Sequence, residues 1–528
     1  MIPLLDSAQA LALDAEVERT WALESGTLME SAALRLAGAL MKLIGPPEAW
    51  SSRRIVAAAG SGNNGGDALA LLRNLAFAGY PNLAALLPSR EPKPLPARHI
   101  ASLVSGGVAV SRWNSAEGRR ALTEADLIID GITGTGLAGP LVDDAADYVA
   151  AINDSCKEVI AIDLPSGFRD EAGAGEPRIR AAYTLSIEPR KLCLYAPALR
   201  PQAGRIIGVE GVFPTRRILR RENLNATSPL PVAPSLLCSA DIPDLLFQPS
   251  EWSHKGDRGR LAVFAGSPGM VGAALLAARA AQAAGAGLVT LFIRDELFDA
   301  LRAASPESIG GAIIRPESAF QDGLSRQDAL LAGPGWGRDS SRKPLLSALL
   351  DVELPLVLDA DAVRILPELP PRARRAPLLL TPHPGEFETL SAKPLASILA
   401  APRNILAEIA RERGASIALK TATTWLMAPD GSLRILDGGE AGLAVAGSGD
   451  VLAGLVAGLV ARMSGGGEGP TTNDKAFRAL CLASLVHLEA GRALRKEEGW
   501  FEASRLVSGA GAILGRPMAF SSLNPTVP

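Results

Sequence analysis

The sequence predicts two α/β domains, each built on a mostly parallel sheet with helices on both faces. Short apolar segments alternate with stretches of helical periodicity along most of the chain. Glycines, hydroxyl residues and carboxylates gather directly after the apolar segments, which is where ligands bind in parallel sheets. With 528 residues, the chain is also too long for a single hydrophobic core.

Composition and charge narrow the classes of function. Hydrophobic residues make up 48% and charged residues 21%, as in ordinary globular proteins. A formal net charge of −3 argues against nucleic-acid binding. The four cysteines form no paired motif, which favours a reducing compartment without disulfides or zinc. Neither a signal peptide nor a membrane span is recognisable, so we expect a cytoplasmic protein without a membrane partner.

The first elements predict a phosphate-binding loop. Residues 7–44 carry helical periodicity, residues 54–58 form a short apolar strand, and a helix is expected over 68–78. Between that strand and helix lies the glycine-rich segment 60–67, an arrangement typical of phosphate or dinucleotide binding. The structural alternative is a tight turn with an asparagine-rich helix cap.

Two further strands, over 127–130 and 159–163, each end in an aspartate before a glycine-containing loop. We expect Asp67, Asp130 and Asp163 to converge on one crevice at the carboxyl ends of the strands. Each of them alone is also a plausible strand-end cap. The oxygen-bearing side chains in these segments suit a hard cation.

The motifs GSGNNGGD, DGITGTGLAGP and AIDLPSG resemble the N-terminal domain of the NAD(P)H-hydrate repair family, an epimerase with a Rossmann-like three-layer fold. The resemblance covers residues 1–215. It implies that Asp163 is the catalytic acid/base and that Lys191 matches a lysine which the family often carries. One departure is Ala68, where the family usually has glycine.

The same resemblance implies two sets of ligand contacts. A potassium ion would be held by Asn64, Asp130 and Ser166. The hydrated cofactor would contact Asn63, Asn64, Gly65, Gly66, Asp67, Gly134, Thr135, Gly136, Leu137, Ala138, Gly139, Pro140 and Asp163.

A domain boundary is expected near residue 225. Residues 215–234 are basic and then rich in Asn, Ser and Pro, without sustained periodicity, which is typical of a linker. We place the first domain at residues 1–220, the linker at 221–234 and the second domain at 235–520.

The second half repeats the rhythm of strand, loop and helix. A helix is expected to open at the glycine-rich segment 266–273, and polar loops follow the later strands. The predicted strands span 260–265, 288–293, 328–332, 356–358, 378–380 and 416–419.

Several loop residues in this half are candidates for ligand contacts. His383 lies between two prolines, and its alternative is a purely structural loop histidine. Residues 420–424 offer a cation, hydroxyls and amides for a phosphate chain, or they form a solvated loop. Asp359 and Asp361 would either cap the next helix or organise a metal bound to a nucleotide.

The segment 440–460 is the strongest single signal in the chain. A run of small residues ends in Gly447-Ser448-Gly449-Asp450, and an apolar helix follows. Amides at a helix N-terminus favour a phosphate, and a carboxylate there suits a base that deprotonates a hydroxyl being phosphorylated. The alternative is a buried helix start with Asp450 as its N-cap.

The motifs HKGDRGR, GSPGMVGAA, GPGWG, LDADAV, LTPHPGEF, LKTATT and GSGDVLAGLVAGL resemble the nucleotide-dependent dehydratase of the same family, which has a ribokinase-like three-layer fold, over residues 235–515. Thr421 and Ala446 stand where that family commonly has glycine. The resemblance implies that Asp450 is catalytic and that ADP, with a magnesium ion, is the nucleotide, although the sequence itself does not decide between ADP and ATP. Substrate contacts would be Ala273, Gly335, His383 and Asp450, and nucleotide contacts Lys420, Thr421, Ala422, Thr423, Thr424 and Gly449.

Together the motifs predict a bifunctional, homo-oligomeric repair enzyme for hydrated NADH and NADPH. The first domain would interconvert the R and S epimers, and the second would dehydrate the S form with ADP. Two alternatives remain open at this point. One is a ribokinase-type small-molecule kinase with an accessory nucleotide-binding domain. The other makes the first domain a binding module without catalysis.

Overall fold

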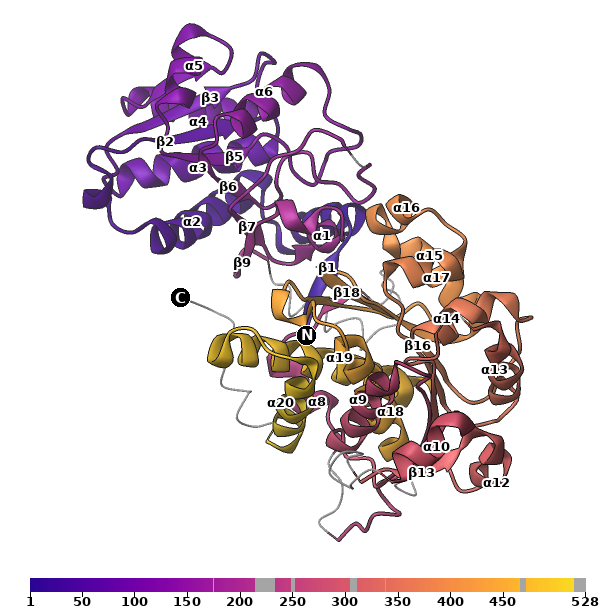
Figure 1. Ribbon diagram of the computed structural model, residues 1–528. Coiled ribbons are helices and arrows are strands. Elements are labelled where there is room, and N and C mark those ends of the chain that lie inside the picture. Colours follow the sequence, from indigo (N-terminus) through magenta and orange to yellow (C-terminus); the bar gives the residue numbers. More distant parts are fainter. Residues whose placement is uncertain are drawn as a thin grey trace. The chain divides into compact units, whose positions relative to one another are not determined.

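The computed structural model describes residues 1–173, 175–213, 233–247, 252–303, 311–337, 339–465 and 472–516. The chain divides into two compact units, Ile2–Pro234 and Ser235–Pro528 with Met1 (Figure 1). The predicted linker, 221–234, falls outside the described residues except for its last two positions. The bounds that we gave to the two domains therefore stay predictions.

The first unit contains a seven-stranded sheet in its described part, and every strand pair in it is parallel. The strand order is β4-β3-β2-β5-β6-β7-β9. The chain first runs outward from β2 to β3 and β4, and then returns to place β5 on the other side of β2. This is the doubly wound arrangement of dinucleotide-binding folds, and the predicted Rossmann-like class is confirmed. The strands are β2 (Ile55–Ala59), β3 (Leu83–Leu87), β4 (Ala109–Arg112), β5 (Leu127–Gly131), β6 (Glu158–Ile162), β7 (Tyr183–Ile187) and β9 (Arg205–Val209).

Helices cover both faces of this sheet because its strands are apolar on both sides. Alternate residues of β2 enter two separate cores: Ile55 packs with Leu36 of α2, and Val56 packs with Tyr148 of α6. The first core is built with α2 (Ser25–Ile44), α3 (Asn63–Phe77) and α4 (Pro94–Ser105), and the second with α5 (Ala116–Thr123) and α6 (Asp143–Asp154).

A short pair of parallel strands, β1 (Ile2–Leu5) and β8 (Arg190–Lys191), also belongs to the first unit. Its parallel register sets Leu5 opposite Lys191. The helical stretch predicted over 7–44 is in fact two helices, α1 (Ser7–Trp21) and α2, since Ala22 ends α1 in a left-handed conformation with φ 50°. The side chain of Asp6 caps α1 by accepting a hydrogen bond from Gln9 N.

The second unit is built on a larger, mainly parallel sheet, as predicted. From β13 to β17 the order is β13-β12-β11-β14-β15-β16-β17 with parallel pairs, and β18 then pairs antiparallel with β17 and β19. The strands are β10 (Ser235–Leu236), β11 (Arg260–Phe264), β12 (Leu288–Ile293), β13 (Ile313–Pro316), β14 (Ala329–Ala332), β15 (Leu356–Leu358), β16 (Leu378–Leu380), β17 (Ala415–Leu419), β18 (Thr423–Met427) and β19 (Leu433–Asp437).

Figure 1 shows helices on both sides of this sheet. One group is α9 (Val271–Ala283), α18 (Ser448–Gly465), α19 (Asn473–Glu498) and α20 (Ala503–Gly515), and the other includes α13 (Lys343–Leu350), α14 (Asp361–Ile365), α15 (Pro384–Ser391) and α17 (Pro402–Arg413). The remaining α-helices are α8 (Ile242–Leu245), α10 (Asp295–Arg302), α12 (Phe320–Leu324) and α16 (Leu395–Ala400). Within the described ranges no helix is long and apolar enough to span a bilayer. All four cysteines are free thiols, as predicted.

Helices α9 and α18 pack closely because glycines of α18 face alanines of α9. A Cβ placed on Gly454 would lie 2.2 Å from the carbonyl oxygen of Ala277, closer than real Cβ atoms approach. We predict that Gly454→Ala destabilises the protein by about 1–3 kcal/mol through this overlap. Gly272→Ala on α9, where the added Cβ meets open space, is the control and should not destabilise. Urea unfolding followed by circular dichroism measures both, and equal midpoints would contradict the prediction.

Candidate active sites

A cavity of about 530 Å³ opens at the carboxyl edge of the first unit's sheet. Its wall combines the loops after β2 and β5 with Asp163 after β6 and with residues of α1 and α2. Of the predicted site residues, those that line it are Asn63, Asn64, Asp67, Gly134, Thr135, Gly136, Leu137 and Asp163. Those that do not line it are Gly65, Gly66, Ala138, Gly139, Pro140, Asp130 and Ser166. Whether each residue contacts a ligand stays a prediction.

The asparagine-rich segment begins a helix and is not a loop ahead of one. We expected a helix over 68–78, but α3 begins at Asn63, so residues 63–67 form its first turn. Gly65 is needed there, since a Cβ on it would lie 2.0 Å from the carbonyl oxygen of Gly60. The first-turn amides of α3 therefore lie at the cavity wall, where a helix N-terminus favours an anion.

Asp163, at the end of β6, has a strained backbone conformation, and hydrogen bonds hold its carboxylate in place. Its φ of 62° lies in the left-handed region, which non-glycine residues rarely adopt. Oδ1 accepts hydrogen bonds from Lys191 Nζ at 2.6 Å and Ile187 N at 3.1 Å, and Oδ2 accepts one from Thr135 Oγ1 at 3.4 Å. The carboxylate thus faces the cavity with a fixed cation beside it.

Three carboxyl groups share this region with Lys191. Burial raises the pKa of Asp67 well above its ordinary value, and the nearby Asp163 and Asp14 raise it further. Burial in the cavity wall also raises the pKa of Asp14 to about 6, against the lowering effect of Lys191. No sequence motif points to Asp14, because it lies on the polar face of α1 outside any recognisable pattern.

Two of the predicted potassium ligands, Asp130 and Ser166, lie behind the cavity wall, and the third, Asn64, lines the cavity. Asp130 is completely buried, so the expectation that it faces the crevice is wrong. Its carboxylate accepts hydrogen bonds from Ser166 N at 2.8 Å and Ser166 Oγ at 2.5 Å. Asn64 Nδ2 donates to Thr133 O at 2.9 Å, and Thr133 N donates to Ser166 Oγ at 2.9 Å. A buried carboxylate that has no ion pair with any described residue fits a cation with oxygen ligands.

In the second unit, hydrogen bonds join the loops that follow β11, β14 and β15. Gly266 N donates to Pro334 O at 2.8 Å, and Gly337 N donates to Asp361 Oδ2 at 2.8 Å. A Cβ placed on Gly335, whose φ is +63°, would lie 2.9 Å from Ala273 Cβ. Two of the predicted substrate-binding positions, Ala273 and Gly335, are therefore neighbours.

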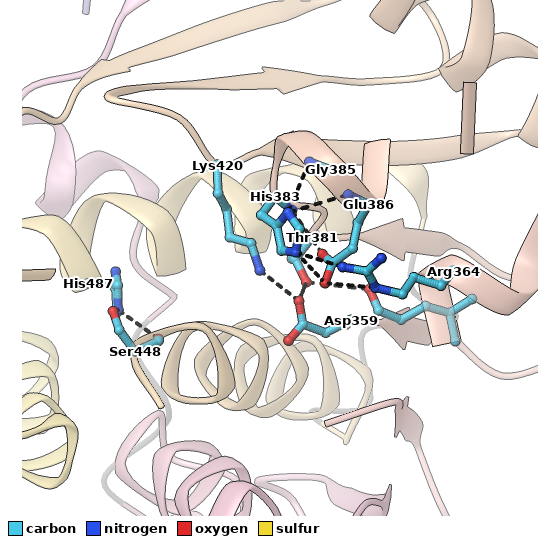
Figure 2. Close-up of polar contacts among 10 residues, drawn as sticks. Asp359, Arg364, Thr381, His383, Gly385, Glu386, Lys420, Ser448 and His487 are labelled. Atoms are coloured by element: carbon cyan, nitrogen blue, oxygen red, sulfur yellow. Dashed lines mark hydrogen bonds and ion pairs between the residues drawn. The ribbon is translucent and has the colours of Figure 1, made fainter. Parts of the chain in front are cut away.

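Asp359, Thr381 and Lys420 form a polar group at the ends of β15, β16 and β17 (Figure 2). Asp359 is 2% exposed, and its Oδ1 accepts from Lys420 Nζ at 2.8 Å and Thr381 Oγ1 at 2.7 Å. A Cβ on Gly449 would lie 3.4 Å from Lys420 Nζ, so the ammonium group also lies against the start of α18. The predicted nucleotide residues Lys420 and Gly449 are thus brought together.

The rest of the predicted nucleotide segment forms the turn into β18. Thr421 and Thr424 are half-buried and Ala422 is exposed. Thr423 is buried, and its hydroxyl accepts a hydrogen bond from Trp425 Nε1 at 3.2 Å, so this side chain is turned inward.

Asp450 lies in the first turn of α18, as predicted, and is not its N-cap. The helix begins at Ser448, after Gly447 with φ +91°. Burial raises the pKa of Asp450 to about 7, with further increases from Asp359, Asp361 and Glu386 and an opposing decrease from Lys420. A carboxyl group with this pKa is suited to general base catalysis near neutral pH.

Two histidines shape this site in different ways. His383 caps α15, and its Nδ1 accepts from Gly385 N at 3.0 Å, which leaves Nε2 facing Glu386 Oε1 at 3.1 Å. His487, on α19, is buried, and burial lowers its pKa to about 4, so it is neutral at pH 7. Its Nε2 lies 3.0 Å from Ser448 O and thereby fixes the first turn of α18. No local motif points to His487, which lies 39 positions from Ser448 in the sequence.

Both units therefore combine glycine-rich loops, a helix N-terminus and a carboxyl group of raised pKa at the carboxyl edge of a doubly wound sheet, as nucleotide-binding α/β enzymes do. Family models match both parts: residues 25–193 match YjeF_N, described as YjeF-related protein N-terminus, and residues 261–509 match Carb_kinase, described as NAD(P)H-hydrate dehydratase. The chain belongs to the bifunctional NAD(P)H-hydrate repair enzyme family.

Several individual proteins are similar to this chain. The repair enzyme of Moorella thermoacetica is 32% identical over 94% of this chain and 93% of its own length. That of Gloeobacter violaceus is 34% identical over 82% of this chain and 84% of its own. A crystal structure of ADP/ATP-dependent NAD(P)H-hydrate dehydratase from Bacillus subtilis is 24% identical, covers 54% of this chain and 98% of its own, and has a TM-score of 0.47.

Proposed function

We propose that this protein repairs hydrated NADH and NADPH, with the first unit epimerising the R and S forms and the second dehydrating the S form with ADP. The observation that carries the proposal is the match of both units, in order, to the two parts of repair enzymes over nearly their whole length. The two carboxyl groups of the sites, Asp163 and Asp450, supply the proton chemistry that each step requires.

Epimerisation changes the configuration of the ring carbon that carries the hydroxyl. The ring nitrogen's lone pair expels the hydroxyl, and water then adds to the resulting iminium carbon from the opposite face. Asp163 would give a proton to the departing oxygen or take one from the entering water, and Lys191 at 2.6 Å holds its carboxylate in place. No net proton is consumed. A potassium ion, when bound by Asn64, Asp130 and Ser166, would supply a fixed positive charge behind the cavity wall.

Dehydration requires a better leaving group than hydroxide. Asp450 would take the proton of the ring hydroxyl as the hydroxyl oxygen attacks the terminal phosphorus of ADP. The phosphoryl group passes to that oxygen, and AMP is the leaving group. The amides at the start of α18 and Lys420 would stabilise the charge on the transferring phosphoryl group. Phosphate then leaves the ring carbon, and loss of a proton from the adjacent carbon restores the double bond. Magnesium carried by the nucleotide would find carboxylate oxygens at Asp359 and Asp361.

The direct test incubates the full chain with a mixture of R and S hydrated NADH and with ADP, and follows the absorbance of reduced nicotinamide. Complete recovery of NADH from both epimers, with one AMP and one phosphate formed per NADH, is expected. Phosphorylated product without recovery of NADH would instead favour the kinase alternative. Recovery that stops when the S form is exhausted would favour a first unit without catalysis.

Lys420→Met is expected to raise the KM for ADP about tenfold to a hundredfold, because a charge-assisted contact to phosphate is lost. The same variant should shift the pH profile of dehydration upward, since Lys420 lowers the pKa of Asp450. Lys393→Met, which removes a half-exposed lysine 3.9 Å from Glu408, is the control. Steady-state kinetics between pH 5.5 and about 9 measures both effects. An unchanged KM for ADP would mean that Lys420 does not contact the phosphates of ADP.

Cytoplasmic location, a homo-oligomeric state and the bound potassium ion stay predictions. Size-exclusion chromatography with light scattering tests the oligomeric state. Epimerisation assays with potassium exchanged for sodium test the cation.

A further inference from the structure

Two cations line the first unit's cavity and have no part in the chemistry proposed above. Arg90 and Lys93 both contribute to the cavity wall. Neither side chain hydrogen-bonds or ion-pairs with any residue that the structure describes. Two unpaired cations at the wall of a ligand cavity point to an anionic group of the ligand.

Hydrogen bonds and an ion pair hold the segment that carries these cations on both sides. Arg112 donates to Arg90 O at 3.2 Å and pairs with Glu91 at 2.9 Å. Ser89 binds Asp144 through its amide and its hydroxyl, each at 2.9 Å. Lys93 N donates to the carbonyl oxygen of Ser61, in the glycine-rich loop, at 3.0 Å. The backbone of Arg90 and Lys93 is therefore placed in advance beside that loop.

The strand order determines how the lining residues are arranged along the carboxyl edge of the sheet. The strands β6, β5, β2 and β3 are successive neighbours, and the cavity residues Asp163, Gly134–Leu137, Ser61–Asn64 and Arg90 follow their carboxyl ends in that order. Three strand spacings separate β6 from β3, about 14 Å, which suits an extended dinucleotide. Asp163 and its partner Lys191 lie at one end of this path, and Arg90 lies at the other.

A dinucleotide with its reacting ring at Asp163 would set its pyrophosphate at the N-terminus of α3, next to the middle strands. Its adenosine ribose would then reach the end of β3. In doubly wound folds an arginine near this place accommodates the 2′-phosphate that distinguishes NADP from NAD. Arginine suits this role because its planar guanidinium binds a phosphate through two parallel hydrogen bonds.

We propose that Arg90 and Lys93 form a subsite for a phosphate monoester on the adenosine ribose, so that the first unit prefers hydrated NADPH to hydrated NADH. This inference rests on the proposed epimerase function and names the substrate that it favours. Lys93 adds a second positive charge to the same phosphate, and Arg90 provides the directional contact.

The experiment compares kcat/KM for epimerisation of hydrated NADPH and hydrated NADH in the full chain, without ADP. The wild type should favour hydrated NADPH by about tenfold to a hundredfold. Arg90→Ala with Lys93→Ala should abolish this preference through a higher KM for hydrated NADPH, with hydrated NADH unaffected. Arg90→Lys should keep part of the preference. Arg98→Ala, an exposed cation of α4 that does not line the cavity, should change nothing.

A second probe separates this phosphate from the pyrophosphate. Adenosine 2′,5′-bisphosphate should inhibit epimerisation of hydrated NADH more strongly than AMP in the wild type, and equally with AMP in the double variant. Equal kcat/KM for both substrates in the wild type would overturn the subsite, as would an equal loss for both substrates in the double variant. No epimerisation of either substrate would instead refute the proposed function itself.

Discussion

Asp450→Asn is expected to lower kcat for dehydration by about 10²- to 10⁴-fold and to leave epimerisation unchanged. Asparagine keeps the shape of the side chain but cannot accept the hydroxyl proton as phosphoryl transfer begins. Only the carboxylate combines a place in the first turn of α18 with a pKa near neutrality. The measurement is NADH recovery from the purified S form with ADP, alongside epimer ratios followed by chromatography.

Asp474→Asn is the matched control, because Asp474 also lies in the first turn of a helix in the same unit but is exposed to solvent. It should retain full dehydration activity. If Asp450→Asn dehydrated the S form at the wild-type rate, another group would have to be the base. Glu386 and Asp359, which both act on the pKa of Asp450, would then be the first residues to test.

The pH dependence of dehydration follows from the same carboxyl group. Burial and neighbouring carboxylates raise its pKa to about 7, so the protonated, inactive form gains population as pH falls through that value. We expect kcat/KM for the S form to decrease with falling pH, by about tenfold per unit well below the pKa. A rate that is constant from pH 8 down to about 5 would show that Asp450 does not act as the base.

The features that the sequence predicted are those encoded locally. Apolar segments followed by glycines and carboxylates identified the strands and placed Asp163, Lys420 and Asp450 at strand or helix ends, as the structure has them. Motif spacing cannot determine which way a side chain turns after its strand. Asp130 follows the same pattern as Asp163, yet it turns behind the wall to accept hydrogen bonds from Ser166.

The residues that the sequence analysis missed come from distant segments. Asp14 reaches the cavity because α1 forms part of its wall, and Arg90 does so because β3 neighbours β2. His487 fixes the start of α18 from another helix. Each of these depends on the strand order or on helix packing, which no single segment specifies. The early start of α3 at Asn63 was missed because asparagine and glycine are weak helix formers, and packing of the turn against the Gly60 loop overrides that preference.

Asp163→Asn is expected to lower the rate of epimerisation by about 10²- to 10⁴-fold and to spare dehydration of the S form. The carboxylate is held by Lys191 Nζ at 2.6 Å and by Ile187 N at 3.1 Å in a left-handed backbone conformation, which asparagine also tolerates. The substitution therefore removes the charge and the proton acceptor while the turn is kept. In the repair assay, the S form should still be recovered at the wild-type rate, and the R form only as slowly as it epimerises without the enzyme.

Asp147→Asn, an exposed carboxylate on α6 of the same unit, is the control for the loss of one negative charge. Lys191→Met supplies an independent check on the ion pair between Asp163 and Lys191. Without the ammonium group the Asp163 carboxylate loses the hydrogen bond from Lys191 Nζ that orients it, so kcat for epimerisation should fall while KM stays unchanged. A Lys191→Met enzyme with a raised KM would mean that the lysine contacts the substrate directly. Wild-type epimerisation in Asp163→Asn would transfer the acid/base role to Asp67 or Asp14, the other carboxyl groups of the cavity.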